Sequence, residues 1–422
     1  MPHIDSWVPV PAGSDFTIYN LPYGAFIHRG RTRLGIAIGT RILDLYALAE
    51  AGLVDGVVAR ELLQAQSLNP FLAAGHAVWK KVRLHVAALL RRDDRGDSAL
   101  RERNSAAFFV EQAAATMVVP MKIGDYVDFY SSLEHATNLG KILRPNSEPL
   151  LPNWRHMPIA YHGRASTVVI DGTPIVRPNG QRKPPGADVP DFGPTQRLDI
   201  ELEVGFVTGP GNRLGHPIRA SAAREHIFGL VLVNDWSARD IQAWEYQPLG
   251  PFLGKSFATT ISPWIVTLDA LEPFRTGGPM QEPQPLPYLL GPDRAAYDIK
   301  LEVDLSTQRM RDDGIAPITI SRTNFKELYW SMAQQLAHVT VNGTQIRPGD
   351  LYASGTISGR EPDSLGSFIE LTWNATKPIA LPPGEVRGFL QDGDEVTLRG
   401  WCEQGQFRIG FGSARGRIVP SG

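Results

Sequence analysis

The sequence is almost free of cysteine, with Cys402 as the only one among 422 residues. A single cysteine excludes an internal disulfide and is typical of a reducing compartment, so we expect a cytoplasmic protein. Cys402 lies in a run, residues 398–403, that resembles a strand and has no base beside it. We therefore interpret it as a buried structural thiol rather than as a nucleophile.

Long apolar runs and a strong charge imbalance are also missing. No stretch approaches the ~18 apolar residues of a transmembrane helix, and the N-terminus lacks the basic-then-apolar pattern of a signal peptide. The formal net charge of −2 gives no argument for a nucleic acid or an anionic membrane as partner. We therefore expect a folded protein that binds neither nucleic acid nor membranes.

Glycine and proline, in contrast, are abundant, with 41 glycines and 34 prolines spread along the chain. Frequent turns between short strands favour a β-rich fold. Residues 44–90 show helical periodicity, whereas the chain after residue 118 alternates strand runs with turns and has few helices, after Ser237 and at 330–339. The sequence predicts a mainly β (β-rich α+β) protein, with a small N-terminal domain at 1–117 and a large mixed β-sandwich or roll at 118–422.

The stretch 199–204 alternates acidic and apolar residues, Asp-Ile-Glu-Leu-Glu-Val. This alternation is the period of a β-strand, so its apolar side chains are predicted to face a core and Asp199, Glu201 and Glu203 the opposite side. Neighbouring carboxylates on one face repel each other unless water or a cation screens them. The spacing alone leaves two interpretations open, a solvated surface and a cation site.

A histidine follows a good helix start in residues 128–138. Ser132 suits the N-cap of a helix that begins at Leu133, and His135 then lies in the first turn. The positive end of the helix dipole favours a neutral imidazole, which can accept a proton. The alternative is a capped surface helix with an incidental histidine.

A donor-rich helix face follows an apolar strand that ends at Asp235. Arg239, Gln242 and Tyr246 are spaced three and four residues apart, so they share one face of the predicted helix. Hydrogen-bond donors beside a carboxylate at a strand end are typical of a substrate site. A surface helix with mixed polar residues explains the same pattern.

Two further charged residues stand in apolar surroundings. Lys255 belongs to a Gly-Lys-Ser triplet, but Leu249 stands where a phosphate-binding loop needs glycine, so that motif is absent. Lys255 then either extends its head to water or neutralises an anion. Glu370 interrupts the apolar run 368–373, which we predict as a strand, and either faces solvent or pairs with a buried group.

Four carboxylates, Asp128, Glu201, Glu203 and Asp235, form a candidate ligand set that includes no cysteine or histidine. Such a set suits a hard, oxygen-seeking cation such as Ca²⁺ or Mg²⁺ rather than zinc.

These motifs, in this order, resemble the fumarylacetoacetase (fumarylacetoacetate hydrolase) family, and the resemblance runs nearly end to end. The segments that carry it are 128–138, 201–203, 234–242, 254–257 and 354–359. The resemblance implies an SH3-like N-terminal barrel, a C-terminal β-roll and a homodimer. It also implies hydrolysis of the carbon–carbon bond of 4-fumarylacetoacetate to fumarate and acetoacetate, the last step of tyrosine and phenylalanine catabolism.

The resemblance implies Ca²⁺ and/or Mg²⁺ as cofactor and assigns roles position by position. The implied metal ligands are Asp128, Glu201, Glu203 and Asp235, with Lys255 and Thr259 near a second, magnesium site. His135 is the implied base, oriented by Glu370, while Arg239, Gln242 and Lys255 stabilise developing negative charge. The implied substrate contacts are Tyr130, Arg144, Tyr161, Gln242, Tyr246 and Thr356.

Two positions depart from the family pattern. Ala258 stands where the family has glycine, and its methyl group could narrow the pocket beside the metal. Asp199 matches no motif position, and we expect it behind the metal ligands or in solvent.

Two other functions remain open from the sequence. One is a related hydrolase of acylpyruvates or other 1,3-diketones, since the Glu-x-Glu motif with one aspartate marks only the wider superfamily. The other is a non-catalytic, Ca²⁺-stabilised β-sandwich binding module, which leaves His135, Lys255 and the Arg239 face without a role.

Overall fold

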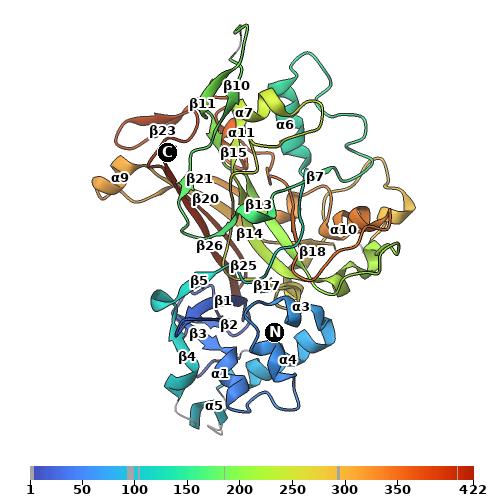
Figure 1. Ribbon diagram of the computed structural model, residues 1–422, viewed down its shortest axis with the longest axis vertical. Coiled ribbons are helices and arrows are strands. Elements are labelled where there is room, and N and C mark those ends of the chain that lie inside the picture. The colour runs from blue at the N-terminus through green and yellow to red at the C-terminus, as the bar shows by residue number, and fades with distance from the viewer. Residues whose placement is uncertain (1–3, 93–98, 103–104, 185, 292–294, 406) are drawn as a thin grey trace.

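The computed structural model describes residues 4–92, 99–102, 105–184, 186–291, 295–405 and 407–422. The N-terminal part forms a small lobe at the bottom of Figure 1, and the rest of the chain forms a larger lobe above it. Both lobes are built around β-sheets with helices at their margins, so the predicted β-rich α+β class is confirmed.

The N-terminal lobe contains an antiparallel five-stranded sheet in the order β4-β3-β2-β1-β5. Its strands are β1 (Tyr23–His28), β2 (Arg31–Ile38), β3 (Arg41–Asp44), β4 (Phe109–Glu111) and β5 (Thr116–Val118). The helices of this lobe are α1 (Leu45–Glu50), α2 (Arg60–Leu63), α3 (Asn69–Ala73), α4 (His76–Leu90) and α5 (Ala99–Glu102). In α4 the buried residues recur three and four positions apart, which confirms the amphipathic helix expected there.

The larger lobe is organised on an eight-stranded sheet in the order β7-β6-β22-β13-β14-β16-β8, with β17 also paired to β14. Its strands are β6 (Tyr126–Phe129), β7 (Ala160–His162), β8 (Val168–Ile170), β13 (Leu202–Thr208), β14 (Ile227–Asp235), β16 (Thr259–Ile261), β17 (Val266–Thr267) and β22 (Leu351–Ala353). Every residue of β13 and β14 is buried, because these central strands are covered on both faces.

A second sheet, in the order β21-β20-β25-β26-β9, packs against the first. Its strands are β9 (Ile175–Val176), β20 (Lys300–Ser306), β21 (Ile318–Asn324), β25 (Glu395–Gln404) and β26 (Phe407–Val419). A Cβ atom at Gly400 would lie 2.8 Å from Leu232, and one at Gly416 would lie 2.5 Å from Trp236, so these glycines allow the sheets to approach closely. Cys402 is buried in β25, which confirms the structural thiol, and burial raises its pKa.

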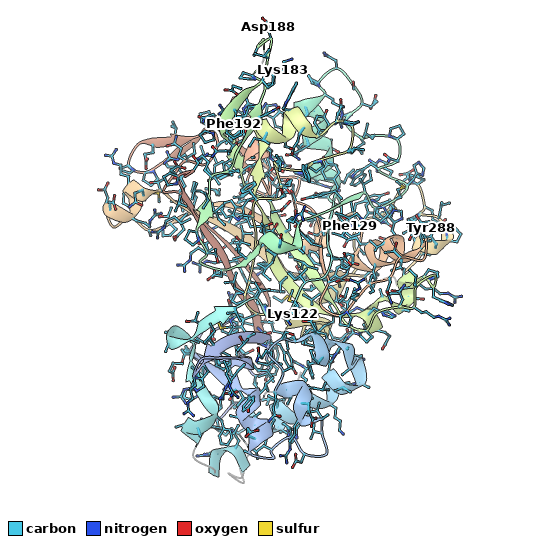
Figure 2. All side chains as sticks on the ribbon, in the orientation of Figure 1. Lys122, Phe129, Lys183, Asp188, Phe192 and Tyr288 are labelled. Carbon is cyan, nitrogen blue, oxygen red and sulfur yellow. The ribbon has the colours of Figure 1, made fainter. Side chains whose placement is uncertain are left out.

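Shorter elements surround this sandwich. The helices are α6 (Leu133–Leu143), α7 (Arg239–Glu245), α8 (Leu268–Leu271), α9 (Gln308–Asp312), α10 (Met332–Thr340) and α11 (Phe368–Leu371). The small two-stranded sheets pair β10 (Asn179–Arg182) with β11 (Asp191–Pro194), β12 (Leu198–Asp199) with β15 (Ser237–Ala238), β18 (Arg275–Thr276) with β19 (Ala296–Tyr297), and β23 (Ile379–Leu381) with β24 (Glu385–Arg387). The β10–β11 hairpin projects from the top of the large lobe, near Lys183, Asp188 and Phe192 (Figure 2).

Two predicted strands are wrong in part. Residues 368–371 form the helix α11 because the backbone amides of Phe368 and Ile369 donate to the Asp199 carboxylate, at 2.6 and 3.1 Å, instead of to a neighbouring strand. The stretch 199–204 is divided between β12 and β13. At the break, the Glu201 amide donates to a side chain, Asn234 Oδ1 at 3.1 Å, instead of to a backbone carbonyl of a neighbouring strand.

The two lobes share an apolar cluster where they meet. Tyr23 of β1 stacks on Phe71 at 5.3 Å between ring centroids and meets the Phe228 ring edge-on at 5.3 Å. The backbones of Tyr23 and Ile265 also exchange two hydrogen bonds of 3.0 and 2.7 Å. Across the described ranges, the helices are too short or too polar to cross a bilayer.

Candidate active site

The strand register brings polar side chains to one end of the eight-stranded sheet. Asp128, near the end of β6, lies opposite Tyr161 of β7. Asp235, the last residue of β14, lies opposite Thr259, the first residue of β16. Glu203 lies near the start of β13, beside the end of β14. Phe129, the neighbour of Asp128, locates this region inside the large lobe in Figure 2.

Three of the four carboxylates predicted as metal ligands converge closely enough to share a cation. Oxygens of Asp128, Glu201 and Asp235 lie within 4.8 Å of one another, and all three residues are buried. Glu203 lies beside them and accepts a 2.9 Å hydrogen bond from the Gly355 amide through Oε2. Within the described chain, Glu203 Oε1 and Asp128 Oδ1 are buried without a hydrogen-bond partner. Because unpartnered buried oxygens are costly, this donor set fits a hard divalent cation.

Donors from three elements orient the Asp235 carboxylate. The Lys255 ammonium lies 2.9 Å from Asp235 Oδ2 and also contacts Glu201. The Tyr161 hydroxyl donates to Asp235 Oδ2 at 2.6 Å, and the Thr259 hydroxyl donates to Oδ1 at 2.9 Å. The structure thus places three residues around the Asp235 carboxylate: Lys255 and Thr259, which the resemblance assigns near a magnesium site, and Tyr161, which it assigns to the substrate.

The carboxylates of the cluster differ in their electrostatics. Burial raises the pKa of Asp128 and of Glu203 well above the ordinary range, and neighbouring carboxylates raise it further. Burial also disfavours ionised Glu201, but Lys255 and Arg239 outweigh it and lower the Glu201 pKa to about 2. Although burial opposes the charge of Lys255, Asp235 and Glu201 raise its pKa, so it stays cationic. The cluster retains negative charge that a divalent cation can neutralise.

His135 forms a buried pair with Glu370. The Ser132 hydroxyl accepts from the His135 amide at 3.2 Å, which confirms the predicted N-cap of α6. His135 Nδ1 lies 2.6 Å from Glu370 Oε2, and His135 is only 2% exposed, which contradicts an incidental surface histidine. The contact fixes the ring through Nδ1 and leaves Nε2 as the nitrogen available for proton transfer.

Glu370 is fully supported by hydrogen bonds. Besides His135, it accepts from Asn138 Nδ2 at 3.0 Å, from the Ser358 hydroxyl at 2.9 Å and from the Ser367 hydroxyl at 2.7 Å. Burial alone would raise its pKa, but His135, Asn138 and Ser367 lower it. Glu370 is therefore an ionised, immobilised partner for the histidine.

The helix α7 presents a cationic face to the cluster. Arg239 Nη1 donates to Gln242 Oε1 at 3.2 Å, so these residues share a face as their spacing predicted. Arg239 Nη2 lies 2.9 Å from Glu201 Oε1, and Nε donates to Asp199 Oδ2 at 2.8 Å. Tyr246 follows the helix and lies further out, 39% exposed.

The remaining candidates for substrate contact are Tyr130, Arg144 and Thr356. The Tyr130 ring meets the His135 ring edge-on, with centroids 5.4 Å apart. Arg144 ends α6 and donates to the Pro149 carbonyl at 2.9 Å through Nη2. Among described residues, Arg144 Nε and the Thr356 hydroxyl are buried without a partner, as expected of groups that bind a ligand.

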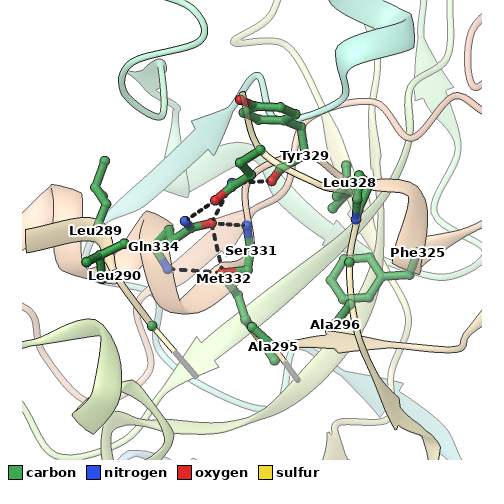
Figure 3. Close-up of a pocket in the computed structure, with 14 residues that line it drawn as sticks. Leu289, Leu290, Ala295, Ala296, Phe325, Leu328, Tyr329, Ser331, Met332 and Gln334 are labelled. Atoms are coloured by element: carbon green, nitrogen blue, oxygen red, sulfur yellow. Dashed lines mark hydrogen bonds between the residues drawn. The ribbon is translucent and has the colours of Figure 1, made fainter. Parts of the chain in front are cut away.

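A cavity of about 290 Å³ adjoins the cluster at Lys255 and is lined also by Tyr126, Tyr161 and Arg164. A second cavity, of about 220 Å³, lies elsewhere in the large lobe (Figure 3). Its glutamines, Gln281 and Gln334, bond each other at 2.8 and 3.1 Å, and its described lining has no acidic, basic or histidine side chain. Of these two cavities, only the first is lined by described residues that contact the carboxylate cluster.

Ala258 does not line either of these cavities. Its side chain is buried and belongs to the apolar cluster of the sandwich. Its methyl group is thus part of the core rather than of the pocket wall.

Several supporting residues were not predicted as functional. Asn138 lies three residues after His135 and Ser367 three before Glu370, so helical spacing could have indicated both. Of the two places expected for Asp199, the position behind the metal ligands fits its contact with Arg239, whereas the position in solvent is wrong because Asp199 is completely buried. Its contacts to residues 368 and 369 lie 169 and 170 positions away in the chain, beyond any local pattern.

Comparisons with known proteins find relatives along nearly the whole chain. Residues 19–120 match the family described as fumarylacetoacetase N-terminal, and residues 126–419 match fumarylacetoacetate (FAA) hydrolase C-terminal. The chain is 51% identical to the fumarylacetoacetase of Homo sapiens over 424 residues and to that of Arabidopsis thaliana over 426, in each case across 99% of both chains.

Among solved structures, the fumarylacetoacetate hydrolase of Exiguobacterium antarcticum is similar, with a TM-score of 0.52 at 18% identity, over 94% of this chain and 99% of that one. At this identity the likeness shows the fold alone.

Proposed function

Because the chain belongs to the fumarylacetoacetate hydrolase family, we propose that the carboxylate cluster and the His135–Glu370 pair form its hydrolytic centre. The protein is a hydrolase of carbon–carbon bonds in ketonic substrates, and it cleaves 4-fumarylacetoacetate to fumarate and acetoacetate. One observation supports the assignment of the centre above the others. A buried histidine–carboxylate pair lies beside a buried acidic cluster whose oxygens are incompletely partnered.

The proposed cation ligands are Asp128, Glu201, Glu203 and Asp235, and the proposed ion is Ca²⁺ or Mg²⁺. Lys255 and Thr259, which both contact Asp235, are proposed to accompany a magnesium site. When bound, such an ion polarises the oxygens of a 1,3-diketone and neutralises the negative charge that develops on them.

The proton transfers are assigned to the His135–Glu370 pair. His135 Nε2 takes a proton from water, and the resulting hydroxide adds to the carbonyl carbon next to the alkene. Glu370 stabilises the imidazolium through Nδ1. The carbon–carbon bond then breaks with its electron pair on the acetoacetate side, and His135 returns the proton to that carbon. Water is thereby divided between fumarate and acetoacetate.

The cationic residues stabilise the oxyanion of the addition step. Lys255 and Arg239 both remain charged, because adjacent carboxylates raise their pKa values despite burial. Gln242 is held against Arg239 by its 3.2 Å contact and adds a neutral amide. Removal of one such donor typically lowers the rate on the order of 10²–10³-fold.

The remaining residues are proposed to orient the substrate. Arg144, with its buried unpartnered Nε among described residues, suits a terminal carboxylate. The other proposed contacts are Tyr130, Tyr161, Tyr246 and Thr356.

The direct test is turnover of fumarylacetoacetate by purified protein supplied with Ca²⁺ or Mg²⁺. A related 1,3-diketone hydrolase would instead show a higher kcat/KM for acylpyruvates, so both substrate classes are compared in the same assay. A non-catalytic Ca²⁺-binding module would bind the ion without turning over any diketone.

Three proposals concern the whole protein. We propose a domain division near residue 117, supported by the end of the N-terminal sheet at Val118. A homodimer and a cytoplasmic location are proposed from the family resemblance and from the single buried cysteine. Limited proteolysis, sedimentation and microscopy of a tagged chain test these in turn.

A further inference from the structure

Asp199 is a completely buried carboxylate that is not among the proposed cation ligands. It accepts four hydrogen bonds. The donors are Arg239 Nε at 2.8 Å and the backbone amides of Ile200 at 2.7 Å, Phe368 at 2.6 Å and Ile369 at 3.1 Å. Charge-assisted bonds of this number and length hold a carboxylate in one position.

The partners of Asp199 belong to two helices of the proposed catalytic centre, α7 and α11. Arg239 begins α7 and faces the cation cluster. Phe368 and Ile369 begin α11, which carries Glu370, the partner of His135. Because α11 has only one turn, anchoring its first two amides also fixes where Glu370 points. The Asp199 carboxylate therefore connects Arg239, which is proposed to stabilise the oxyanion, to the helix that carries Glu370, which orients the base.

Asp199 also governs how Arg239 interacts with the cluster. Arg239 has two ion pairs in the described structure, one with Asp199 and one with Glu201, a proposed cation ligand. Without the charge of Asp199, only Glu201 remains to neutralise the buried guanidinium. Arg239 would then compete with a cation for the same carboxylate.

We propose that Asp199 is a positioning residue that sets Arg239 and the Glu370 helix relative to each other and keeps Glu201 available to the cation. The proposal rests on the proposed function of the centre. It adds a residue that touches neither the substrate nor the ion, and it explains why an acidic residue precedes the Glu-x-Glu pair.

The test is the Asp199→Asn variant, which retains the size of the side chain and removes its charge. Supporting groups behind a metal site typically contribute 10–100-fold to activity or metal affinity. We expect kcat for fumarylacetoacetate to fall about 10–100-fold with a smaller change in KM, and Ca²⁺ affinity measured by calorimetry to fall about tenfold.

The N-terminal lobe offers a matched control in Asp44. It is buried, pairs with Arg33 at 2.6 Å and caps α1 by accepting from the Ala47 amide at 3.1 Å. Asp44→Asn thus removes a similar buried pair and helix cap far along the chain from the site. We expect it to lower the melting temperature but to leave kcat of the folded protein within about twofold of the wild-type value.

Two outcomes of the comparison between the variants overturn the proposal. One is a folded Asp199→Asn protein with wild-type kcat and Ca²⁺ affinity, and the other is an equal loss of kcat in Asp44→Asn. If Asp199→Asn does not fold, hydrogen exchange at residues 366–372 of the folded wild-type protein tests the proposal instead. Slow exchange at the amides of 368 and 369 supports the anchor, and exchange at the rate of a free chain overturns it. An inactive wild-type protein would instead refute the proposed function.

Discussion

Two kinds of buried carboxylate lie in the large lobe, and they differ in how completely the protein satisfies them. Glu370 accepts from His135, Asn138, Ser358 and Ser367, and its pKa is lowered. Asp128 and Glu203 are equally buried, yet their pKa values are raised. Each also keeps an oxygen without a partner among the described residues.

The difference separates an orienting group from a binding group. A satisfied carboxylate stabilises the fold and holds its histidine in one position. An unsatisfied one costs free energy, about 1–3 kcal/mol for each buried polar group left without a partner, until a ligand arrives. We therefore expect the two kinds to respond in opposite ways to removal of their charge.

The largest effect is expected from His135→Ala, which removes the group that Glu370 orients. Because general acid–base catalysis typically contributes 10²–10⁴-fold, kcat for fumarylacetoacetate should fall on the order of that factor. His76→Ala is the control, since His76 pairs with Asp269 outside the centre, and it should retain activity. Unchanged turnover in folded His135→Ala rules out the assigned base.

The next effect is expected from Glu203→Gln, which removes an unsatisfied charge without changing shape. Loss of a proposed ligand should lower kcat on the order of 10²-fold and weaken Ca²⁺ binding. In the presence of a chelator, however, the variant should melt at a higher temperature than the wild type, because the cost of burying the Glu203 carboxylate next to Asp128 and Glu201 is removed. A lower melting temperature there would mean that Glu203 is already satisfied.

Glu370→Gln should have the opposite effect on stability. We expect kcat to fall about 10–100-fold, as for other groups that orient a catalytic histidine. The melting temperature at pH 7 should fall as well, because Glu370 is stabilised as a carboxylate.

The effect of Glu370→Gln on the free energy of unfolding should depend on pH. The pKa of Glu370 is lowered by folding from a reference value of 4.5. Its ionised form therefore stabilises the fold above pH 4.5, and that contribution is lost as the pH falls through the lower, folded-state pKa. The difference in unfolding free energy between wild type and variant, measured in urea, should shrink as the pH falls below 4.5. A constant difference would contradict an ionised Glu370.

The smallest effect is expected from adding Ca²⁺ to the wild-type protein. A ligand present at a hundredfold excess over its Kd stabilises the folded state by about 2.7 kcal/mol if it binds only that state. Thermal unfolding should show this gain in the wild type and in Glu370→Gln, and a smaller gain in Glu203→Gln. Equal gains in stability in all three proteins would show that Glu203 does not bind the cation.

The sequence predicted the parts of this comparison that depend on local patterns. Ser132 was identified as the N-cap of a helix that begins at Leu133, and Arg239 with Gln242 was placed on one face from helical spacing. The apolar run into Asp235 was correctly predicted as a strand. The grouping of four distant carboxylates followed from their residue types and from the family resemblance, since no spacing joins Asp128 to Asp235.

What the sequence could not show depends on contacts between distant segments. The run 368–373 was predicted as a strand from its apolar composition, but the Asp199 carboxylate anchors its first amides and a helix forms. The break within 199–204 has a similar origin, because the Asn234 side chain accepts a hydrogen bond from the Glu201 amide. In both cases a side chain replaces the backbone partner that a strand would need.

The most direct test of the account is turnover of fumarylacetoacetate by one preparation of the protein before chelation, after chelation, and after Ca²⁺ or Mg²⁺ is restored. We predict that activity is lost when the metal content reaches zero and returns with the added ion. Full activity in protein shown by elemental analysis to contain no metal would contradict the account.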